Sequence, residues 1–392
     1  MVIGILKDIK AGEYRVILTP SEVKTLVQDG NEVLLERDAG LKAGFENEEY
    51  EKAGANIVAT MEDIYNRADL VCKVKEFEEI EYGLLKEGQI LFTCIHPAAH
   101  PEEVDALLEK KVIAFTAEDS HRYGSPNCEA AGKIGAFFGL ESLLSINGGK
   151  GKFVSGLTTA PGVQALIIGC GMVGKNALQV LHTMGAWVTV MDINLAALRE
   201  VERLYDGKVN TQISSKANIE KMLPKVDLVI NCVKWPKENK EYMITRQMVK
   251  SMSKGSVIVD ISNDYGVIET FHETHFDNPR YVEEGVVHYC VSNIPSAIAQ
   301  STSIAYAASV LPHIRSLAKD GVNKACIKDG FLRRSLTSYK GYLTHEETSA
   351  IQNKPWVKPE RVLSIENEDL DPAPRATSTR SKNFIKEEDL KI

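Results

Sequence analysis

Along the first third of the chain, short apolar runs alternate with segments whose apolar residues recur at the spacing of a helix. The runs that predict strands lie at residues 2–6, 32–36, 70–74, 89–94 and 112–115. Between them, Thr19 and Pro20 suit the cap and first turn of a helix, and later segments carry apolar residues at helical spacing. Strands that alternate with helices predict a parallel α/β domain, in which functional side chains gather past the carboxyl ends of the strands.

A second alternating region is centred on residues 165–192, ALIIGCGMVGKNALQVLHTMGAWVTVMD. An apolar run leads into a G-x-G-x-x-G turn formed by Gly169, Gly171 and Gly174, and a helix-period segment follows. Glycines in this pattern permit a tight turn, close approach of the backbone to a pyrophosphate, and close packing of helix on strand. The N-terminus of the helix then offers N–H groups to the phosphates.

Asp192 ends the second apolar run of this region, where a carboxylate can accept hydrogen bonds from a ribose 2′-hydroxyl. The same carboxylate would repel a 2′-phosphate, so the pattern favours NAD over NADP. Met172 and Val173 lie within the turn and are expected at the cofactor too. The alternative is an ordinary βαβ unit with a Gly-rich turn, but strand, turn, helix and acid together favour a dinucleotide site.

Further apolar runs at residues 227–233, 256–261 and 285–291 predict the second half of a doubly wound fold. The long helix-period segment at 301–318 plausibly returns to the first domain. We therefore expect an α/β protein with two Rossmann-like domains, each with a parallel doubly wound sheet, and a substrate cleft between them.

The expected boundaries follow from these runs. Residues 1–126 with 301–352 form a discontinuous substrate domain, and residues 127–300 form the NAD-binding domain with its connecting helices. Residues 353–392 are rich in Pro, Ser and charged side chains, a composition that is typical of a flexible extension.

Composition narrows the function class. Apolar residues make up 44% of the chain, charged residues 26%, and the net charge is −8 without a basic stripe, which argues against a nucleic-acid partner. The seven cysteines are scattered without a C-x-x-C pair, as expected for reduced thiols in a cytoplasmic protein. The sequence has neither metal-ligand spacing nor a signal peptide or spanning segment, so we expect no metal and no membrane partner.

Several segments carry a resemblance to a known family. They are IGILKDIKAGEYRVILTP, LVCKVKE, EGQILFTCIHPAA, the GCGMVG turn with its aspartate, GSVIVDIS and GVVHYCVSNIPSA. Over roughly residues 1–350 the chain resembles alanine dehydrogenases and the soluble NAD-binding part of nicotinamide nucleotide transhydrogenase. The resemblance implies an NAD-dependent, homo-oligomeric enzyme that reversibly deaminates an L-amino acid to a 2-oxo acid.

The resemblance also implies residue roles. Arg15 looks like the arginine that binds the substrate carboxylate, Lys75 like the lysine near the carboxylate and oxo group, and His96 like the acid/base histidine. Asp264 falls on the aspartate beside the nicotinamide and the substrate amine. The chemistry agrees, since Arg binds carboxylates in bidentate fashion and His transfers protons near neutrality. We also expect contacts to the cofactor from three further residues, Cys128, Val233 and Asn293.

Each of these residues also has an ordinary structural interpretation, as a surface charge, a loop histidine or a turn aspartate. The sequence departs from the family at residues 114–116, Ala-Phe-Thr in place of the usual Ala-Tyr-Glu, and residues 229–235 are similar to carboxyethyl-ornithine synthase. Two alternative functions therefore stay open. One is an opine-type or saccharopine-type enzyme that joins an amino acid to an oxo acid, and the other is a non-catalytic transhydrogenase-like NAD-binding subunit.

Overall fold

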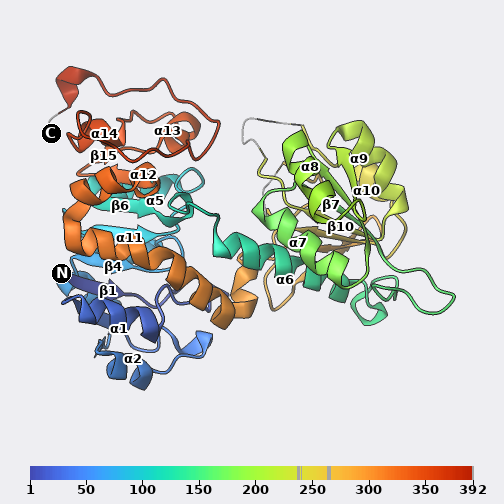
Figure 1. Cartoon of the computed structure of the whole chain (residues 1–392), viewed down its shortest axis with the longest axis horizontal. Helices are drawn as coiled ribbons and strands as arrows, with labels where there is room; N and C mark the ends of the chain where they lie inside the picture. The colour runs from blue at the N-terminus through green and yellow to red at the C-terminus, as the bar shows by residue number, and fades with distance from the viewer. Residues whose placement is uncertain (236–238, 240, 263–265, 391–392) are drawn as a thin grey trace. The chain divides into compact units, whose positions relative to one another are not determined.

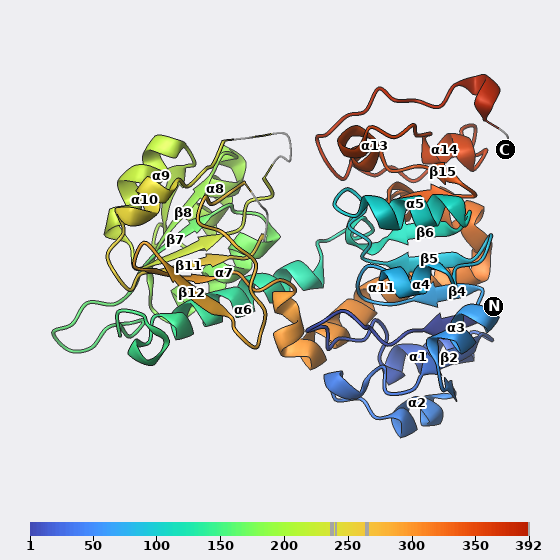
Figure 2. The ribbon, with the colours of Figure 1, turned by 180° about the vertical axis from the view of Figure 1, so that it is seen from behind.

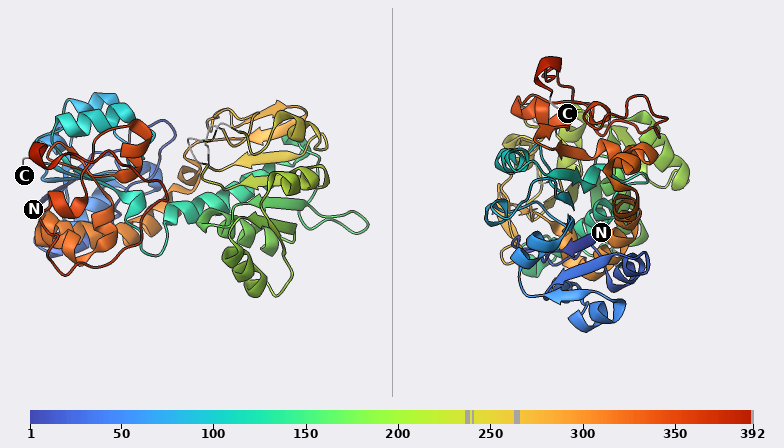
Figure 3. Two further views of the ribbon diagram at one scale, coloured as in Figure 1. Left: turned by 90° about the horizontal axis from the view of Figure 1, so that it is seen from above. Right: turned by 90° about the vertical axis from the view of Figure 1, so that its left-hand side faces the viewer.

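The computed structural model describes residues 1–235, 239, 241–262 and 266–390. It divides into two compact units, each described below by itself. Unit 1 comprises Met1–Ser125 and Ala299–Ile392, and unit 2 comprises Pro126–Ile298. Both chain ends belong to unit 1 (Figure 3). The predicted cleft between the domains stays a prediction.

Unit 1 is built on an eight-stranded sheet with the order β15-β14-β6-β5-β4-β1-β2-β3. The strands are β1 (Val2–Ile5), β2 (Glu32–Glu36), β3 (Asn56–Val58), β4 (Leu70–Cys72), β5 (Ile90–Thr93), β6 (Ile113–Thr116), β14 (Leu336–Tyr339) and β15 (Tyr342–Leu343). Strands β1 to β6 pair in parallel, whereas β14 is antiparallel to β6 and β15 to β14. The sheet is therefore mixed at one edge, where the prediction was a purely parallel sheet.

Helices cover both faces of this sheet. Residues of α1 (Pro20–Gln28), α2 (Asn47–Ala53) and the long α11 (Ala299–Lys328) share one core with the strands (Figure 1). The opposite face packs against α3 (Met61–Arg67), α4 (Glu79–Tyr82) and α5 (Pro101–Glu109), as seen from behind in Figure 2. Because apolar side chains are buried on both faces, the inner strands are short continuous apolar runs, which is why the sequence predicted them.

The C-terminal part of unit 1 holds α12 (Gly330–Arg334), α13 (Glu346–Gln352) and α14 (Pro359–Val362). Composition predicted a flexible extension beyond residue 352, but side chains of this stretch join the core. Val357, Val362, Leu363 and Ile365 are buried against the same cluster as α11. Trp356 stacks on Phe384 with ring centroids 4.9 Å apart. A few apolar side chains anchor a mostly polar segment here, and average composition does not reveal such anchors.

Unit 2 has a seven-stranded sheet with the order β12-β13-β11-β10-β7-β8-β9. The strands are β7 (Gln164–Ile168), β8 (Trp187–Asp192), β9 (Asn210–Ile213), β10 (Leu228–Asn231), β11 (Val257–Asp260), β12 (Arg280–Glu283) and β13 (Val286–Tyr289). One face packs against α6 (Pro126–Ser142), α7 (Met172–Thr183) and α8 (Leu195–Leu204). The other packs against α9 (Lys216–Met222) and α10 (Arg246–Lys250).

The two parallel cores share one strand order. Counting each set of parallel strands from its own first strand, both sheets run 3-2-1-4-5-6, the order of a dinucleotide-binding doubly wound fold. The chain reverses direction across the sheet between β1 and β4 in unit 1 and between β7 and β10 in unit 2. Ligands bind beyond the carboxyl ends of the strands at such reversal points, so this topology locates two candidate sites.

Candidate functional site

Four loops meet at the carboxyl edge of the sheet in unit 1. The loop after β1 carries Arg15, the loop after β4 carries Lys75, and the loop after β5 carries His96. A single 3-10 turn (Ala117–Asp119) after β6 carries Glu118. These strands are neighbours around the reversal point, so the structure brings the three residues predicted in this unit to one edge.

His96 is held by Glu118. The Oε1 atom of Glu118 accepts a hydrogen bond of 2.6 Å from the backbone N–H of His96 and lies 3.1 Å from its Nδ1. Burial would raise the pKa of Glu118, but the charge of His96 and its hydrogen bonds outweigh that effect and hold this pKa below its usual range. Glu118 therefore stays ionised and can orient the ring, leaving Nε2 for chemistry.

The backbone of His96 is itself unusual. Its φ angle is +50°, in the left-handed region that non-glycine residues rarely adopt, and 46% of its side chain is exposed. Backbone in such a sparsely populated region persists when its surroundings over-determine it, often at functional sites. An exposed ring on a strained but well-anchored backbone suits a proton-transfer group.

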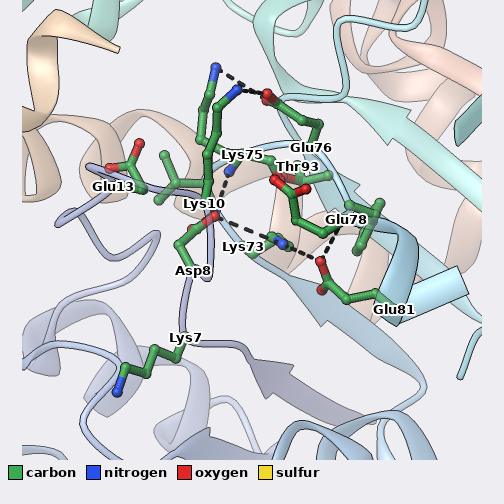
Figure 4. A network of polar contacts seen from close by, with 12 residues as sticks. Lys7, Asp8, Lys10, Glu13, Lys73, Lys75, Glu76, Glu78, Glu81 and Thr93 are labelled. Atoms are coloured by element: carbon green, nitrogen blue, oxygen red, sulfur yellow. Dashed lines mark hydrogen bonds and ion pairs between the residues drawn. The ribbon is translucent and has the colours of Figure 1, made fainter. Parts of the chain in front are cut away.

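Lys75 lies on the loop after β4, whose backbone is held by hydrogen bonds to Asp8. Asp8 accepts hydrogen bonds from the backbone N–H groups of Val74 (2.8 Å) and Lys75 (3.3 Å). The Nζ of Lys75 lies 3.2 Å from Oε2 of Glu76, and Lys10 contacts the other oxygen of the same carboxylate (Figure 4). Two lysines thus converge on one carboxylate at this edge.

Below this loop lies a buried ion-pair network. Lys73 has a fully buried side chain, and its Nζ lies 2.7 Å from Oε2 of Glu81 and 3.9 Å from Oδ1 of Asp8 (Figure 4). The phenol of Tyr65 donates to the other oxygen of Glu81 at 2.9 Å. Burial raises the pKa of Asp8 to about 6, against the opposing effect of Lys73. This network ties the loops after β1 and β4 together.

Arg15 is almost fully buried and paired. Its Nε and Nη2 donate to the two carboxylate oxygens of Glu13 at 2.7 and 2.6 Å, and its backbone N–H donates to the same carboxylate. The next residue is fixed as well, since the N–H of Val16 donates to Oγ of Ser303 on α11. The bidentate pair sets the plane of the guanidinium.

The buried thiol of Cys94 shows how these groups gather. Burial and the charge of Glu118 raise its pKa to about 12, against the lowering effects of the Tyr306 hydroxyl and the charges of Lys75 and Arg15. Its Sγ lies 3.2 Å from the Tyr306 hydroxyl. The charges of Arg15, Lys75 and Glu118 all act on this one buried thiol. The three side chains therefore lie near the end of β5.

In unit 2 the Gly-rich turn has the geometry that its sequence predicted. Gly169 has φ +95°, and a Cβ atom on Gly174 would lie 1.9 Å from the carbonyl oxygen of Gly169. At Gly171, the N-cap of α7, a Cβ would meet nothing within 4 Å. The turn and the packing therefore require glycine, and the open space at Gly171 fits a pyrophosphate approaching the helix N-terminus.

Asp192 ends β8 beside this turn. Its Oδ2 accepts a hydrogen bond of 2.6 Å from the N–H of Cys170, and its Oδ1 accepts one of 2.7 Å from that of Asn194. Each carboxylate oxygen has a second lone pair, so these contacts orient the group and leave acceptor capacity for a ribose hydroxyl. The Gly-rich turn, the N-terminus of α7 and the Asp192 carboxylate therefore fit an NAD molecule.

The other residues predicted at the cofactor lie on α6, on α7 and in the loops after β10 and β13. Met172 and Val173 form the first turn of α7, and a methyl of Val233 would lie 3.3 Å from a Cβ on Gly169. Cys128 lies in the first turn of α6, whose Gly132 packs so closely that a Cβ would lie 2.1 Å from the carbonyl oxygen of Val173. Asn293 follows β13 with φ +63°. Asp264 lies outside the described residues.

Sequence reasoning missed Glu118, Asp8 and Glu13. Glu118 follows the end of β6, the same kind of position that singled out Lys75 and His96. Asp8 and Glu13 lie in a polar loop whose folding back onto β4 and Arg15 no local pattern reveals.

Within the described residues, no cluster of three or more His, Cys, Asp or Glu side chains has the geometry to hold a metal ion. Among the helices of that same part of the chain, none combines the length and apolar character that a membrane crossing requires.

Comparison with known proteins agrees with this geometry. Residues 4–125 match the family model described as "Alanine dehydrogenase/PNT, N-terminal domain", and residues 136–346 match that of the C-terminal domain. The chain is 38% identical to an alanine dehydrogenase from Methanococcus maripaludis over 93% of this chain and 100% of the relative. It is 37% identical to one from Bacillus subtilis over 94% and 99%. A solved structure of an L-alanine dehydrogenase has a TM-score of 0.83 and 35% identity over 90% of this chain and 99% of that one. The chain therefore belongs to the alanine dehydrogenase/PNT family.

Proposed function

We propose that this protein is an NAD-dependent oxidoreductase that reversibly deaminates L-alanine to pyruvate and ammonium. The observation that carries the proposal is the His96–Glu118 pair at the carboxyl edge of unit 1, beside Lys75 and Arg15. An exposed histidine oriented by an ionised carboxylate is the arrangement of a general acid/base. The names of the relatives supply the substrate class.

Deamination requires that water add to the imine carbon and that nitrogen leave as ammonium. His96 takes the proton from the attacking water and passes a proton to the departing nitrogen, while Glu118 keeps Nδ1 in the orientation that leaves Nε2 toward the substrate. Lys75 stabilises negative charge that develops on the oxygen of the adduct. When bound, NAD accepts the hydride from the substrate Cα.

Arg15 binds the substrate carboxylate in this proposal. Its pairing with Glu13 fixes the guanidinium plane and neutralises its charge. Recognition therefore depends on hydrogen-bond geometry at Arg15, with Lys75 and Lys10 supplying the attractive field. We also place Asp264 beside the substrate amine.

The cofactor binds to unit 2 in the proposal. The turn at Gly169–Gly174 and the N-terminus of α7 hold the pyrophosphate, and Asp192 binds the adenosine ribose and disfavours a 2′-phosphate. Met172, Val173, Cys128, Val233 and Asn293 line the rest. We further propose a cytoplasmic homo-oligomer, because the dispersed free cysteines are typical of a reducing compartment and the resembling family is commonly oligomeric.

The opine-type alternative requires a pocket for a second amino acid. Thr116 departs from the family's usual glutamate, but its side chain is fully buried in β6, so it does not line an open pocket. The acidic side chain that contacts His96 is instead Glu118, which follows Thr116 closely in the sequence. Thr116 therefore makes no room for a second amino acid, and the proposal keeps ammonium as the nitrogen substrate.

The test is NADH oxidation by the purified protein with pyruvate, once with ammonium and once with each of several primary amines, including lysine and ornithine. Turnover with ammonium supports the proposal. Turnover only with a bulky amino acid would establish the opine-type alternative. NADH binding without turnover on pyruvate, other oxo acids or any amine would favour the non-catalytic subunit.

A further inference from the structure

Helix α13 (Glu346–Gln352) touches both segments that hold the candidate acid/base histidine. Its N-cap residue contacts the turn that carries Glu118, and its last residue contacts the loop that carries His96. This helix begins where the match to the C-terminal family domain ends, at residue 346. We infer that α13 is a clamp that positions His96 against Glu118, an inference that rests on the proposed function of His96.

The N-terminal end of the clamp is His345, the N-cap of α13. Its Nδ1 accepts a hydrogen bond from the backbone N–H of Thr348, and its Nε2 lies 3.0 Å from Oδ2 of Asp119. Because Nδ1 is the acceptor, the proton of a neutral ring lies on Nε2, which donates to the aspartate. Asp119 adjoins Glu118 in the same 3-10 turn, so this bond fixes the turn that presents the Glu118 carboxylate.

A second contact fixes the same turn from the other side. The Nε of Arg334 donates to the backbone carbonyl of Asp119 at 2.7 Å. Asp119 thus receives one hydrogen bond on its side chain and one on its backbone, both from the C-terminal part of unit 1. A short 3-10 turn has few hydrogen bonds of its own, so outside contacts decide its orientation.

The C-terminal end of the clamp is Gln352. Its Nε2 donates a hydrogen bond of 2.7 Å to the carbonyl oxygen of Pro97, the residue that follows His96. The backbone of His96 is in the left-handed region, which is costly for a non-glycine residue, so the loop needs contacts that hold it there. The Gln352 bond and the Glu118 bond to the His96 N–H anchor the loop on both sides of the histidine.

Further contacts tie α13 to other parts of unit 1. The hydroxyl of Ser349 lies 2.7 Å from that of Ser381 and donates to the carbonyl of Lys354 at 2.6 Å. The ammonium of Lys354 contacts Asp105 on α5. These contacts hold α13 in place without touching either the His96 loop or the Glu118 turn, which makes them a natural control.

Three variants separate positioning from folding. His345→Asn keeps an N-cap acceptor, since Asn is a favoured cap, but removes the donor to Asp119. Gln352→Glu keeps the shape of the side chain but presents no N–H to the carbonyl of Pro97. Ser349→Ala is the matched control, because it weakens the outer anchorage of the same helix and leaves both clamp contacts in place.

Two measurements are made on each variant. Steady-state kinetics with pyruvate and ammonium should show that kcat falls roughly 10-fold in His345→Asn and Gln352→Glu while the KM for NADH stays unchanged, as for partners that orient a reacting group. Spectra of protein labelled with 13C at the histidine Cε1 should show the His96 signal displaced in both variants. That signal is assigned among the nine histidines by its loss in His96→Gln.

The outcomes are distinct. The clamp is supported if the two variants move the His96 signal and lower kcat, and Ser349→Ala lowers only the melting temperature. It is overturned if His345→Asn and Gln352→Glu behave like Ser349→Ala. The spectra require no substrate, so they test the clamp even if turnover with pyruvate is absent, an outcome that would instead count against the proposed function.

Discussion

The Oε1 atom of Glu118 lies 2.6 Å from the backbone nitrogen of His96 and 3.1 Å from its Nδ1. One carboxylate oxygen thus holds both the backbone and the ring of the same histidine. A ring fixed in this way has Nδ1 committed to the carboxylate, which leaves Nε2 for chemistry. The relationship makes His96 the residue around which the proposed chemistry is arranged.

Glu118→Gln should lower kcat by about 10-fold to 100-fold. Glutamine can still accept both hydrogen bonds, so the variant removes the charge alone, and a bond to a charged group contributes roughly 1.5–3 kcal/mol. Glu102→Gln, on the exposed first turn of α5, is the control and should retain wild-type kinetics.

Lys73→Met should destabilise the fold by about 3–5 kcal/mol, because it leaves the carboxylates of Asp8 and Glu81 buried without their cation. Urea unfolding at neutral pH measures the loss. The pKa of Asp8 is about 6 with Lys73 present and rises further without it, so the deficit should shrink as the pH falls toward 6, since a protonated carboxyl needs no cation. Lys86→Met, at an exposed position, should change the free energy of unfolding by less than about 0.5 kcal/mol.

Asp192→Asn should relax the choice of cofactor. The amide oxygen can still accept a backbone hydrogen bond, but the charge that repels a 2′-phosphate is gone. We expect the ratio of kcat/KM for NADH over NADPH to fall at least roughly 10-fold, which corresponds to about 1.4 kcal/mol. Asp206→Asn, in an exposed turn, provides the comparison. An unchanged ratio in Asp192→Asn would show that the ribose binds elsewhere.

His288 should make unit 2 less stable in mild acid. Burial lowers its pKa from 6.5 to about 4, and Thr270 and the carbonyl of Val286 hold the neutral ring at 2.8 and 3.0 Å. The unfolded chain therefore takes up a proton between these values that the folded chain does not, so this stability is present above pH 6.5 and is lost as the pH falls toward 4. Between pH 7 and pH 5 the loss is roughly 2 kcal/mol.

The measurement is urea unfolding of wild type and His288→Gln at both pH values, followed by circular dichroism. Glutamine can occupy both hydrogen bonds without titrating, so the variant should lose less stability between the two pH values than the wild type. His275→Gln replaces an exposed histidine and should follow the wild type. Equal slopes for wild type and His288→Gln would assign the acid sensitivity to other groups.

The parts of the fold that could be predicted from sequence are those that local pattern determines. The segment from Ala165 to Asp192 contains its strand, turn, helix and acid in order, so each element follows from its neighbours. The antiparallel edge strands β12, β14 and β15 were missed. The burial of β12 is incomplete and its sequence, RYVE, lacks a continuous apolar run, so the sequence does not distinguish it from a loop.

The candidate site was predictable where a residue follows an apolar strand and less so where tertiary folding supplies the partner. Lys75 and His96 follow β4 and β5 and stood out for that reason. His345 acts through Asp119, 226 residues away in sequence, and no local pattern relates the two. The same holds for Asp8, which reaches the loop after β4 from 66 residues away.

The most direct test of the proposed chemistry is the turnover of His96→Gln with NADH, pyruvate and ammonium, measured together with the Kd for NADH. Removing a general acid/base group should lower kcat by about 100-fold to 10,000-fold and leave the Kd for NADH unchanged, because the proposed cofactor-binding residues belong to unit 2. If His96→Gln turns over at the wild-type rate, His96 is not the acid/base group and its pairing with Glu118 serves structure alone.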